Sequence, residues 1–172
     1  MKKSRIILGF AAAAIMTCGM GLRSNAIAGS SNNDAEISAV EHHLAEAQTA
    51  AAAMKYYDSG PDLMVYDIVP PAEYKGGPAW RKDLDGFFAN FPGPSKIEFL
   101  VLKVESSGKL GVAYSVQRFT STGKDGKPFV LVFRATDVLH KRDGKWLIVH
   151  EHLSVPVDLT TGKPDLQATI PD

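Results

Sequence analysis

The sequence predicts an α+β fold in which N-terminal helices wrap a curved antiparallel β-sheet into a cone-shaped pocket. Two observations support this class. The first half of the chain carries apolar residues at helical spacing, whereas the second half contains four long segments that alternate apolar and polar residues. Helices followed by antiparallel strands form one packed domain. Long strands curl, and a curled sheet leaves a cavity between itself and the helices.

The N-terminus has the pattern of a secretory signal peptide. Three basic residues within the first five positions precede an apolar run, and Ala26-Ile27-Ala28 supplies small side chains before a cleavage site. We predict that residues 1–28 are removed and that the protein is exported, to the periplasm or out of the cell. A retained membrane anchor and a lipoprotein signal at Cys18 are the alternatives, but the apolar run is shorter than the roughly 20 residues of a spanning helix.

Removal of this segment would change the chemistry of the chain. Cys18 is the only cysteine, so the mature chain would form no disulfide and use no thiol. The segment is basic and contains no acid, which leaves the mature chain net acidic. This charge argues against nucleic acid or an anionic membrane as a partner. We expect residues 29–33 to form a flexible leader, 34–156 one domain and 157–172 an extended C-terminal tail.

Two amphipathic helices are predicted in the first half. The first begins after Asn33, placed as an N-cap with Glu36 three residues on, and ends at Gly60. Its apolar residues recur at spacings of three and four: Ile37, Val40, Leu44, Ala47, Ala51 and Met54. The second begins near Pro78 and ends before Pro92. A short strand is expected between them, over residues 63–69.

Four antiparallel strands are predicted in the second half. They are joined by turn residues, such as Gly123-Lys124-Asp125-Gly126 and Asp143-Gly144. The expected strands cover residues 96–105, 109–120, 128–140 and 145–155. Their order along the chain predicts a meander.

Two stretches resemble the SnoaL-like, ketosteroid-isomerase-like branch of the nuclear-transport-factor-2-like superfamily. One runs from Val65 to Gly76 and continues into Ala79-Trp80-Arg81 and the Phe87-Phe88 pair; the other runs from Asp143 to Pro156. The resemblance covers nearly all of residues 34–160. It implies a cystatin-like roll and a homodimer formed through the convex face of the sheet. It leaves the reaction open, because the superfamily includes isomerases, cyclases, dehydratases, epoxide hydrolases and non-catalytic modules.

Asp67 is the candidate general base. In the steroid isomerases a carboxylate follows a short apolar strand, and Val65-Tyr66-Asp67-Ile68-Val69 is similar to that context. A carboxylate at the lip of an apolar cavity is poorly solvated, which raises its pKa and lets it take a proton from a carbon next to a carbonyl. Ketosteroid isomerase is the precedent for carboxyl groups whose pKa values are shifted by their surroundings.

This chain departs from the family's pattern at the oxyanion hole. The family pairs a tyrosine on the first helix with a protonated aspartate on a later strand. In this chain His42 and His43 occupy the middle of the first helix, where the family has the tyrosine. The position of the family's protonated aspartate falls near Thr136 or Asp137. This departure argues against classical steroid isomerisation. We expect His43 and Thr136 to line the pocket.

The last strand offers a pair of histidines. By period-two spacing Trp146, His150 and His152 share one face of it, and Glu151 lies on the other. The histidines could act as acid, base or hydrogen-bond donor in the pocket, could form half of a metal site with Asp67 or His43, or could be structural. We treat them as catalytic candidates and expect no metal ion.

Arg134 interrupts an apolar strand. It either pairs with a buried carboxylate such as Asp67 or Glu151, or reaches solvent from an outer face; an unpaired buried charge would be costly. We count it among the catalytic candidates. Three further aromatic residues are expected to form the pocket wall: Tyr66, Trp80 and Trp146.

Two classes of function follow from these expectations. The first is a cofactor-independent isomerase or lyase type of enzyme that acts on a small apolar carbonyl or ring compound, with Asp67 assisted by a histidine or by Arg134. The second is a non-catalytic exported module that binds a small apolar ligand or dimerises through the same fold. The predicted partners are a small apolar molecule and a second copy of the chain.

Overall fold

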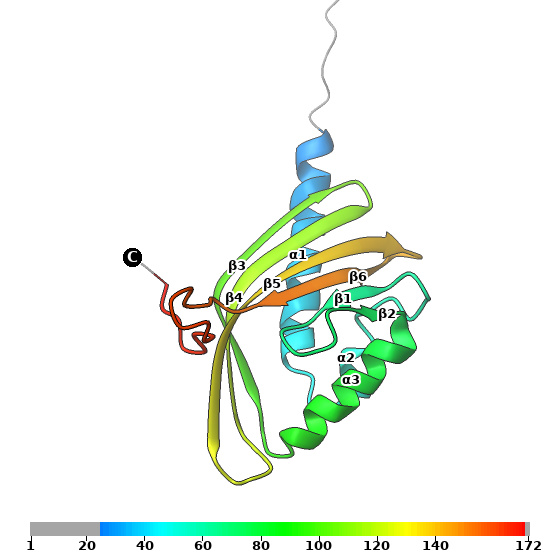
Figure 1. Ribbon diagram of the computed structural model, residues 1–172. Coiled ribbons are helices and arrows are strands. Elements are labelled where there is room, and N and C mark those ends of the chain that lie inside the picture. The colour runs from blue at the N-terminus through cyan, green and yellow to red at the C-terminus, as the bar shows by residue number, and fades with distance from the viewer. Residues whose placement is uncertain (1–24, 171–172) are drawn as a thin grey trace, which may run out of the picture.

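A six-stranded sheet forms the centre of the structure, a computed structural model that describes residues 25–170 (Figure 1). Its strand order is β2-β1-β6-β5-β4-β3. The strands are β1 Met64–Tyr66, β2 Tyr74–Lys75, β3 Lys96–Ser107, β4 Leu110–Thr122, β5 Pro128–Arg142 and β6 Lys145–Ser154. The four long strands form the predicted antiparallel meander, and β1 adds to β6 in parallel. The α+β class with a curved sheet is confirmed, whereas β2 was not predicted.

Three helices cover the concave side of this sheet: α1 Asn25–Ala45, α2 Ala50–Ala53 and α3 Gly77–Asn90 (Figure 1). The prediction of one continuous first helix is wrong, because the chain breaks after Ala45 and restarts at α2. Thr49 caps the new helix by accepting a hydrogen bond from the Ala52 N–H to its Oγ1 at 3.1 Å. The break brings the segment after α2 alongside β6, where a parallel backbone bridge joins Tyr57 to Ile148.

The first helix also begins earlier than the sequence predicted. The backbone of residues 29–33 belongs to α1, so the expected leader is helical and Asn33 is not an N-cap. The Asn33 side chain instead donates to the carbonyl of Gly108 at 3.1 Å. This contact ties α1 to the turn between β3 and β4. The predicted cleavage after Ala28 lies mostly outside the described residues and stays a prediction.

A β-bulge in β6 decides which residues of that strand face the concave side. Leu139 pairs with Ile148, but Val138 pairs with His150, so Val149 is an extra residue without a partner. An extra residue reverses the alternation of side chains. Trp146 and Ile148 therefore point inward before the bulge, as Glu151 does after it.

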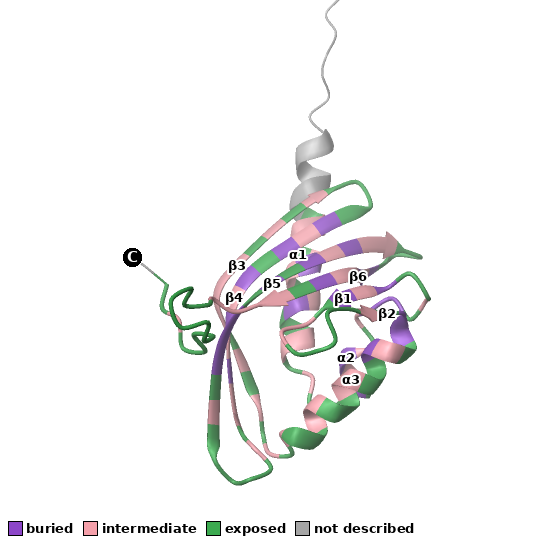
Figure 2. Ribbon diagram, in the orientation of Figure 1, coloured by how far each residue is buried: buried purple, intermediate pink, exposed green. Residues whose placement is uncertain are grey.

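The core forms where α1 approaches the sheet. A Cβ on Gly111 of β4 would lie 2.3 Å from Cδ1 of Ile37, so only glycine allows this approach. Ile37 packs with Trp146, Leu139 and Ile148 in a cluster of buried residues. Buried and exposed residues alternate along the strands, as Figure 2 shows.

The tail after β6 returns to the sheet. The backbone N–H of Val132 donates to the carbonyl of Leu166 at 2.8 Å, which covers the edge of β5 beyond the end of β6. An isolated bridge joins Val157 to Pro164. Between residues 25 and 170, no helix has both the length and the apolar character that a membrane crossing requires.

Candidate active site

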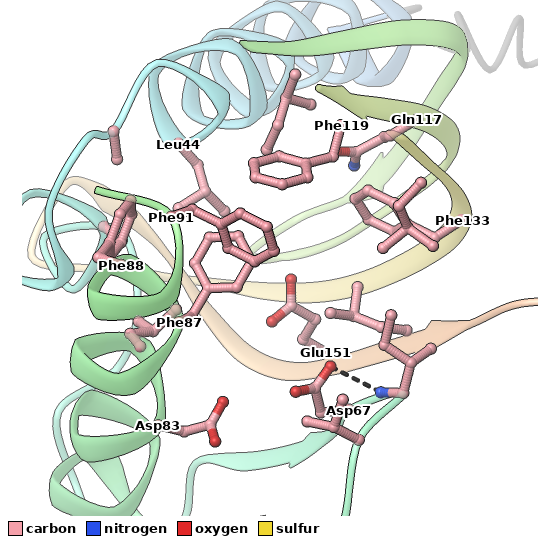
Figure 3. A pocket seen from close by; sticks show the side chains of 18 of the residues that line it. Leu44, Asp67, Asp83, Phe87, Phe88, Phe91, Gln117, Phe119, Phe133 and Glu151 are labelled. Atoms are coloured by element: carbon pink, nitrogen blue, oxygen red, sulfur yellow. Dashed lines mark hydrogen bonds between the residues drawn. The ribbon is translucent and has the colours of Figure 1, made fainter. Parts of the chain in front are cut away.

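A cavity of about 830 Å³ lies between the concave face of the sheet and α3. Its wall is aromatic: Phe87 and Phe88 of α3, with Phe91 directly after the helix, lie opposite Phe119 and Phe133 of the sheet (Figure 3). The rings are packed edge to face or tilted, with centroids of Phe91 and Phe119 separated by 5.1 Å. The sequence-predicted Trp80 also lines this cavity. The cavity therefore suits a ligand with an apolar or aromatic body.

Asp67 faces this cavity from the loop that follows β1. Its Oδ1 accepts a hydrogen bond from the backbone N–H of Ile68 at 2.7 Å, which fixes the carboxyl group. Asp83 of α3 lies across the cavity from it (Figure 3). Burial raises the pKa of Asp67 to about 6, and the nearby Asp83 adds to this effect. Asp67 is thus poised to exchange a proton close to neutral pH.

A second carboxyl group, Glu151 of β6, projects into the same space (Figure 3). It is 5% exposed, and the phenol of Tyr57 donates to its Oε2 at 2.8 Å. Burial raises the pKa of Glu151 to about 8, although the hydrogen bond from Tyr57 opposes the shift. At neutral pH this group is largely protonated, in contrast to Asp67.

Glu41 of α1 and Asp137 of β5 complete the buried acidic cluster. Each is 2% exposed and lines the cavity. Burial raises the pKa of Glu41 to about 7 and that of Asp137 well above its usual range. The nearby carboxyl groups of Glu151 and Glu41 add to the rise in the pKa of Asp137. Within the described residues, no hydrogen-bond donor reaches Oε1 of Glu41 or Oδ1 of Asp137.

Sequence reasoning missed Glu41 and Tyr57 as site residues. It placed Glu151 on the face opposite the histidines and named it only as a possible ion-pair partner of Arg134. Glu41 carried a usable signal, because it stands four residues after Ile37 and three before Leu44, on the apolar stripe of α1. An acid on a buried stripe indicates a special environment. Tyr57 and Glu151 carried no comparable signal, since their placement depends on the break after α1 and on the bulge in β6.

The two histidines of β6 do not reach the cavity, which corrects their assignment as pocket residues. They lie on the convex face, where the ring of Tyr66 packs edge to face on His150 at 5.0 Å and on His152 at 5.8 Å. Nδ1 of His150 is 2.9 Å from the carbonyl oxygen of Met64. Tyr66, expected in the pocket wall, therefore also lies outside. The bulge at Val149 is the physical reason, because it turns these side chains outward.

Four other candidates also lie away from the cavity. Arg134 and Thr136 alternate with buried residues of β5 and are exposed on the convex face, so Arg134 makes no ion pair with Asp67 or Glu151. His43 is exposed on α1 and stacks on Tyr56. Trp146 belongs to the core, and its indole N–H donates to Oε2 of Glu36 at 2.9 Å.

The histidines cannot complete a metal site with Asp67, because they occupy opposite faces of the sheet. Among residues 25–170, no group of three or more His, Cys, Asp and Glu side chains has an arrangement that could hold a metal ion.

Residues 37–158 match the family model of the SnoaL-like domain. The chain belongs to the SnoaL-like family. A nuclear-transport-factor-2-like protein of unknown function from Pseudomonas putida KT2440 is similar in structure, with a TM-score of 0.73, 22% identity and coverage of 82% of this chain and 99% of that one. No curated protein sequence matches the chain.

Two further solved structures show the same fold. A nuclear transport factor 2-like superfamily protein from Salmonella enterica has a TM-score of 0.68 and 17% identity, and the match covers 78% of this SnoaL-like chain and 99% of that one. A ketosteroid isomerase-like protein from Erwinia carotovora atroseptica has a TM-score of 0.61 and 18% identity, with 71% and 95% covered. At these identities the likeness establishes the fold.

Proposed function

We propose that this SnoaL-like protein catalyses cofactor-independent proton transfer on a small apolar carbonyl or ring compound. One observation carries the proposal: Asp67 and Glu151 face the same aromatic cavity with pKa values displaced to about 6 and about 8. Two carboxyl groups whose environments hold one ionised and the other protonated at the same pH can serve as base and acid.

The roles of the two groups follow from their protonation. Ionised Asp67 takes a proton from the carbon next to the substrate carbonyl, and protonated Glu151 donates to the carbonyl oxygen as negative charge develops on it. Asp67 then returns the proton to another carbon of the substrate, which completes an isomerisation. The aromatic wall excludes water and so strengthens both interactions. Tyr57 holds the Glu151 carboxyl in position through its hydrogen bond.

Exchange of α-protons for deuterium tests the proposal directly. Proton magnetic resonance would follow exchange in cyclic ketones such as tetralone with the wild-type protein, with Asp67→Asn and with Asp85→Asn. Asp85 lies on α3 and is exposed in an ion pair with Arg81, so it serves as the matched surface control. We expect Asp67→Asn to lower the exchange rate by roughly 10² to 10⁴ and Asp85→Asn to leave it unchanged. Equal rates for wild type and Asp67→Asn would refute a catalytic role.

Binding without turnover is the second candidate function, and one observation favours it. The Tyr57 phenol is already engaged by Glu151, so part of the cluster is satisfied within the protein. Saturable binding of tetralone with no exchange above the rate in buffer would support this alternative.

We further propose that the protein is exported and forms a homodimer through the convex face of its sheet. Apolar side chains are exposed on this face, among them Tyr66, Tyr114 and Val130. A second copy of the chain bound there would bury them. Sedimentation equilibrium of the chain without residues 1–28 would test the dimer, with Val130→Asp as the variant expected to dissociate it. Mass spectrometry of the N-terminus of the exported protein would test cleavage after Ala28.

A further inference from the structure

We propose that the ligand of this cavity carries a protonated amine, which binds the buried carboxyl groups of Glu41, Asp137 and Glu151 while its apolar body contacts the aromatic wall. The inference rests on the proposed function for the choice of site and goes beyond it by naming a ligand class, lipophilic amines, whose charge would hold Glu151 in its ionised form. Three features of the cavity support it.

The first feature is the imbalance of charge. Five carboxyl groups line the cavity: Glu41, Asp67, Asp83, Asp137 and Glu151. The only basic residue in its described lining is Lys82, which is exposed on α3. Walls of low polarity concentrate the field of such a cluster within the cavity. At neutral pH Asp67 is ionised and Glu41 partly so. A bound cation lowers the pKa of the acids that are still protonated, so its charge is balanced by carboxylates that have no basic partner among the described residues.

The second feature is that buried carboxyl oxygens lack hydrogen-bond donors, although the indole N–H of Trp80 in the same lining also has no partner among the described residues. Oε1 of Glu41 and Oδ1 of Asp137 are buried and have no hydrogen-bond partner among the described residues. Glu151 receives one hydrogen bond, from Tyr57, although a carboxylate can accept several. Gln117, which also lines the cavity, uses its amide N–H on Ser115 at 2.9 Å. An ammonium group brings three donors and no acceptor, which is what this set of oxygens lacks.

The third feature is the chemistry of the walls. The faces and edges of Phe87, Phe91 and Phe119 surround the space next to the acids (Figure 3). Aromatic rings attract cations through their quadrupole, and they also bind an apolar body. A ligand with both parts satisfies the acids and the wall together, whereas a neutral ketone satisfies the wall and can only accept hydrogen bonds.

Calorimetric titration of the full chain with a matched set of ligands tests this inference. The probes are naphthylmethylamine, naphthylmethanol and acetonaphthone, which share one aromatic body and differ in the polar group. We expect the amine to bind at least about tenfold more tightly than either neutral probe at neutral pH. Glu151→Gln and Asp137→Asn should each reduce this preference severalfold, and Glu105→Gln should preserve it. Glu105 is a matched control, because it also accepts a hydrogen bond from a tyrosine, Tyr114, at 2.7 Å, but on the surface.

The outcomes separate this inference from the proposed function. Equal or weaker binding of the amine, or a preference that survives both cavity variants, overturns the amine assignment. Tight amine binding together with no α-proton exchange in any probe supports the amine assignment and contradicts the catalytic proposal. Exchange of α-protons without a preference for the amine supports the catalytic proposal and contradicts the amine assignment.

Discussion

Replacement of Glu151 by glutamine should make the protein less sensitive to rising pH. The pKa of this glutamate is 4.5 when it is exposed and about 8 in the folded protein, because the side chain is buried. One pKa unit corresponds to about 1.4 kcal/mol, so keeping the ionised carboxyl group buried costs about 5 kcal/mol. Glutamine has nearly the same shape, carries no charge and can still accept the hydrogen bond from Tyr57. The variant therefore isolates the effect of ionisation.

The direction of the effect follows from where the proton is held. A folded-state pKa above the unfolded value gives a stabilising contribution that is complete below pH 4.5, falls as the pH rises toward about 8, and is absent above it. The wild-type free energy of unfolding should decline over this window. Glu41 and Asp137, whose pKa values are also raised, contribute to the same decline in both proteins. The curve of Glu151→Gln should decline less steeply, and the gap should approach about 5 kcal/mol at the alkaline end.

Guanidinium unfolding followed by tryptophan fluorescence would measure both curves at several pH values from acid to mildly alkaline. Glu105→Gln should follow the wild type throughout, because the Tyr114–Glu105 pair lies on the surface. If wild type and Glu151→Gln keep a constant difference across the window, the carboxyl group of Glu151 does not titrate as a buried acid and the assignment of Glu151 as the proton donor fails with it.

Three further predictions concern the cavity and the core. The rate of α-proton exchange should follow a bell-shaped pH profile with limbs near 6 and 8, since Asp67 must be ionised and Glu151 protonated; a profile whose alkaline limb persists in Glu151→Gln would contradict this assignment. Gly111→Ala should lower the free energy of unfolding by about 1–3 kcal/mol through its clash with Cδ1 of Ile37, and Ile37→Val in the same chain should restore part of the loss in chemical denaturation. His152→Ala should leave the exchange rate unchanged because this side chain lies on the convex face; a large loss of rate would return the histidine to the site.

The sequence predicted the sheet well because strand alternation and turn chemistry are local. The four long strands follow from period-two patterns bounded by turns such as Asp143-Gly144, where Asp143 and Gly144 both adopt positive φ. The second helix follows from Pro78 at its start and a run of aromatic residues on one face. Asp67 was predicted from the resemblance of its strand to the strand that precedes the catalytic carboxylate of the steroid isomerases.

The end of the first helix could not be predicted from local sequence patterns. Its apolar spacing continues past Ala45, so periodicity alone predicts one helix to Gly60. The break is stabilised by contacts with distant residues: the side chain of Gln48 bonds to the backbone of Ser95 in both directions, with Ser95 N–H to Gln48 Oε1 at 3.2 Å. Such contacts leave no periodic trace in the sequence.

The sequence by itself determined the class of the fold, the family and one acid of the cavity, because each depends on neighbouring residues or on a local motif. Tertiary structure decided the rest of the site. A single extra residue at Val149 turns His150 and His152 outward and leaves Glu151 inside, where the break after α1 brings Tyr57 to meet it. Burial then sets the chemistry, since removal from water is what raises the pKa of Glu151 to about 8.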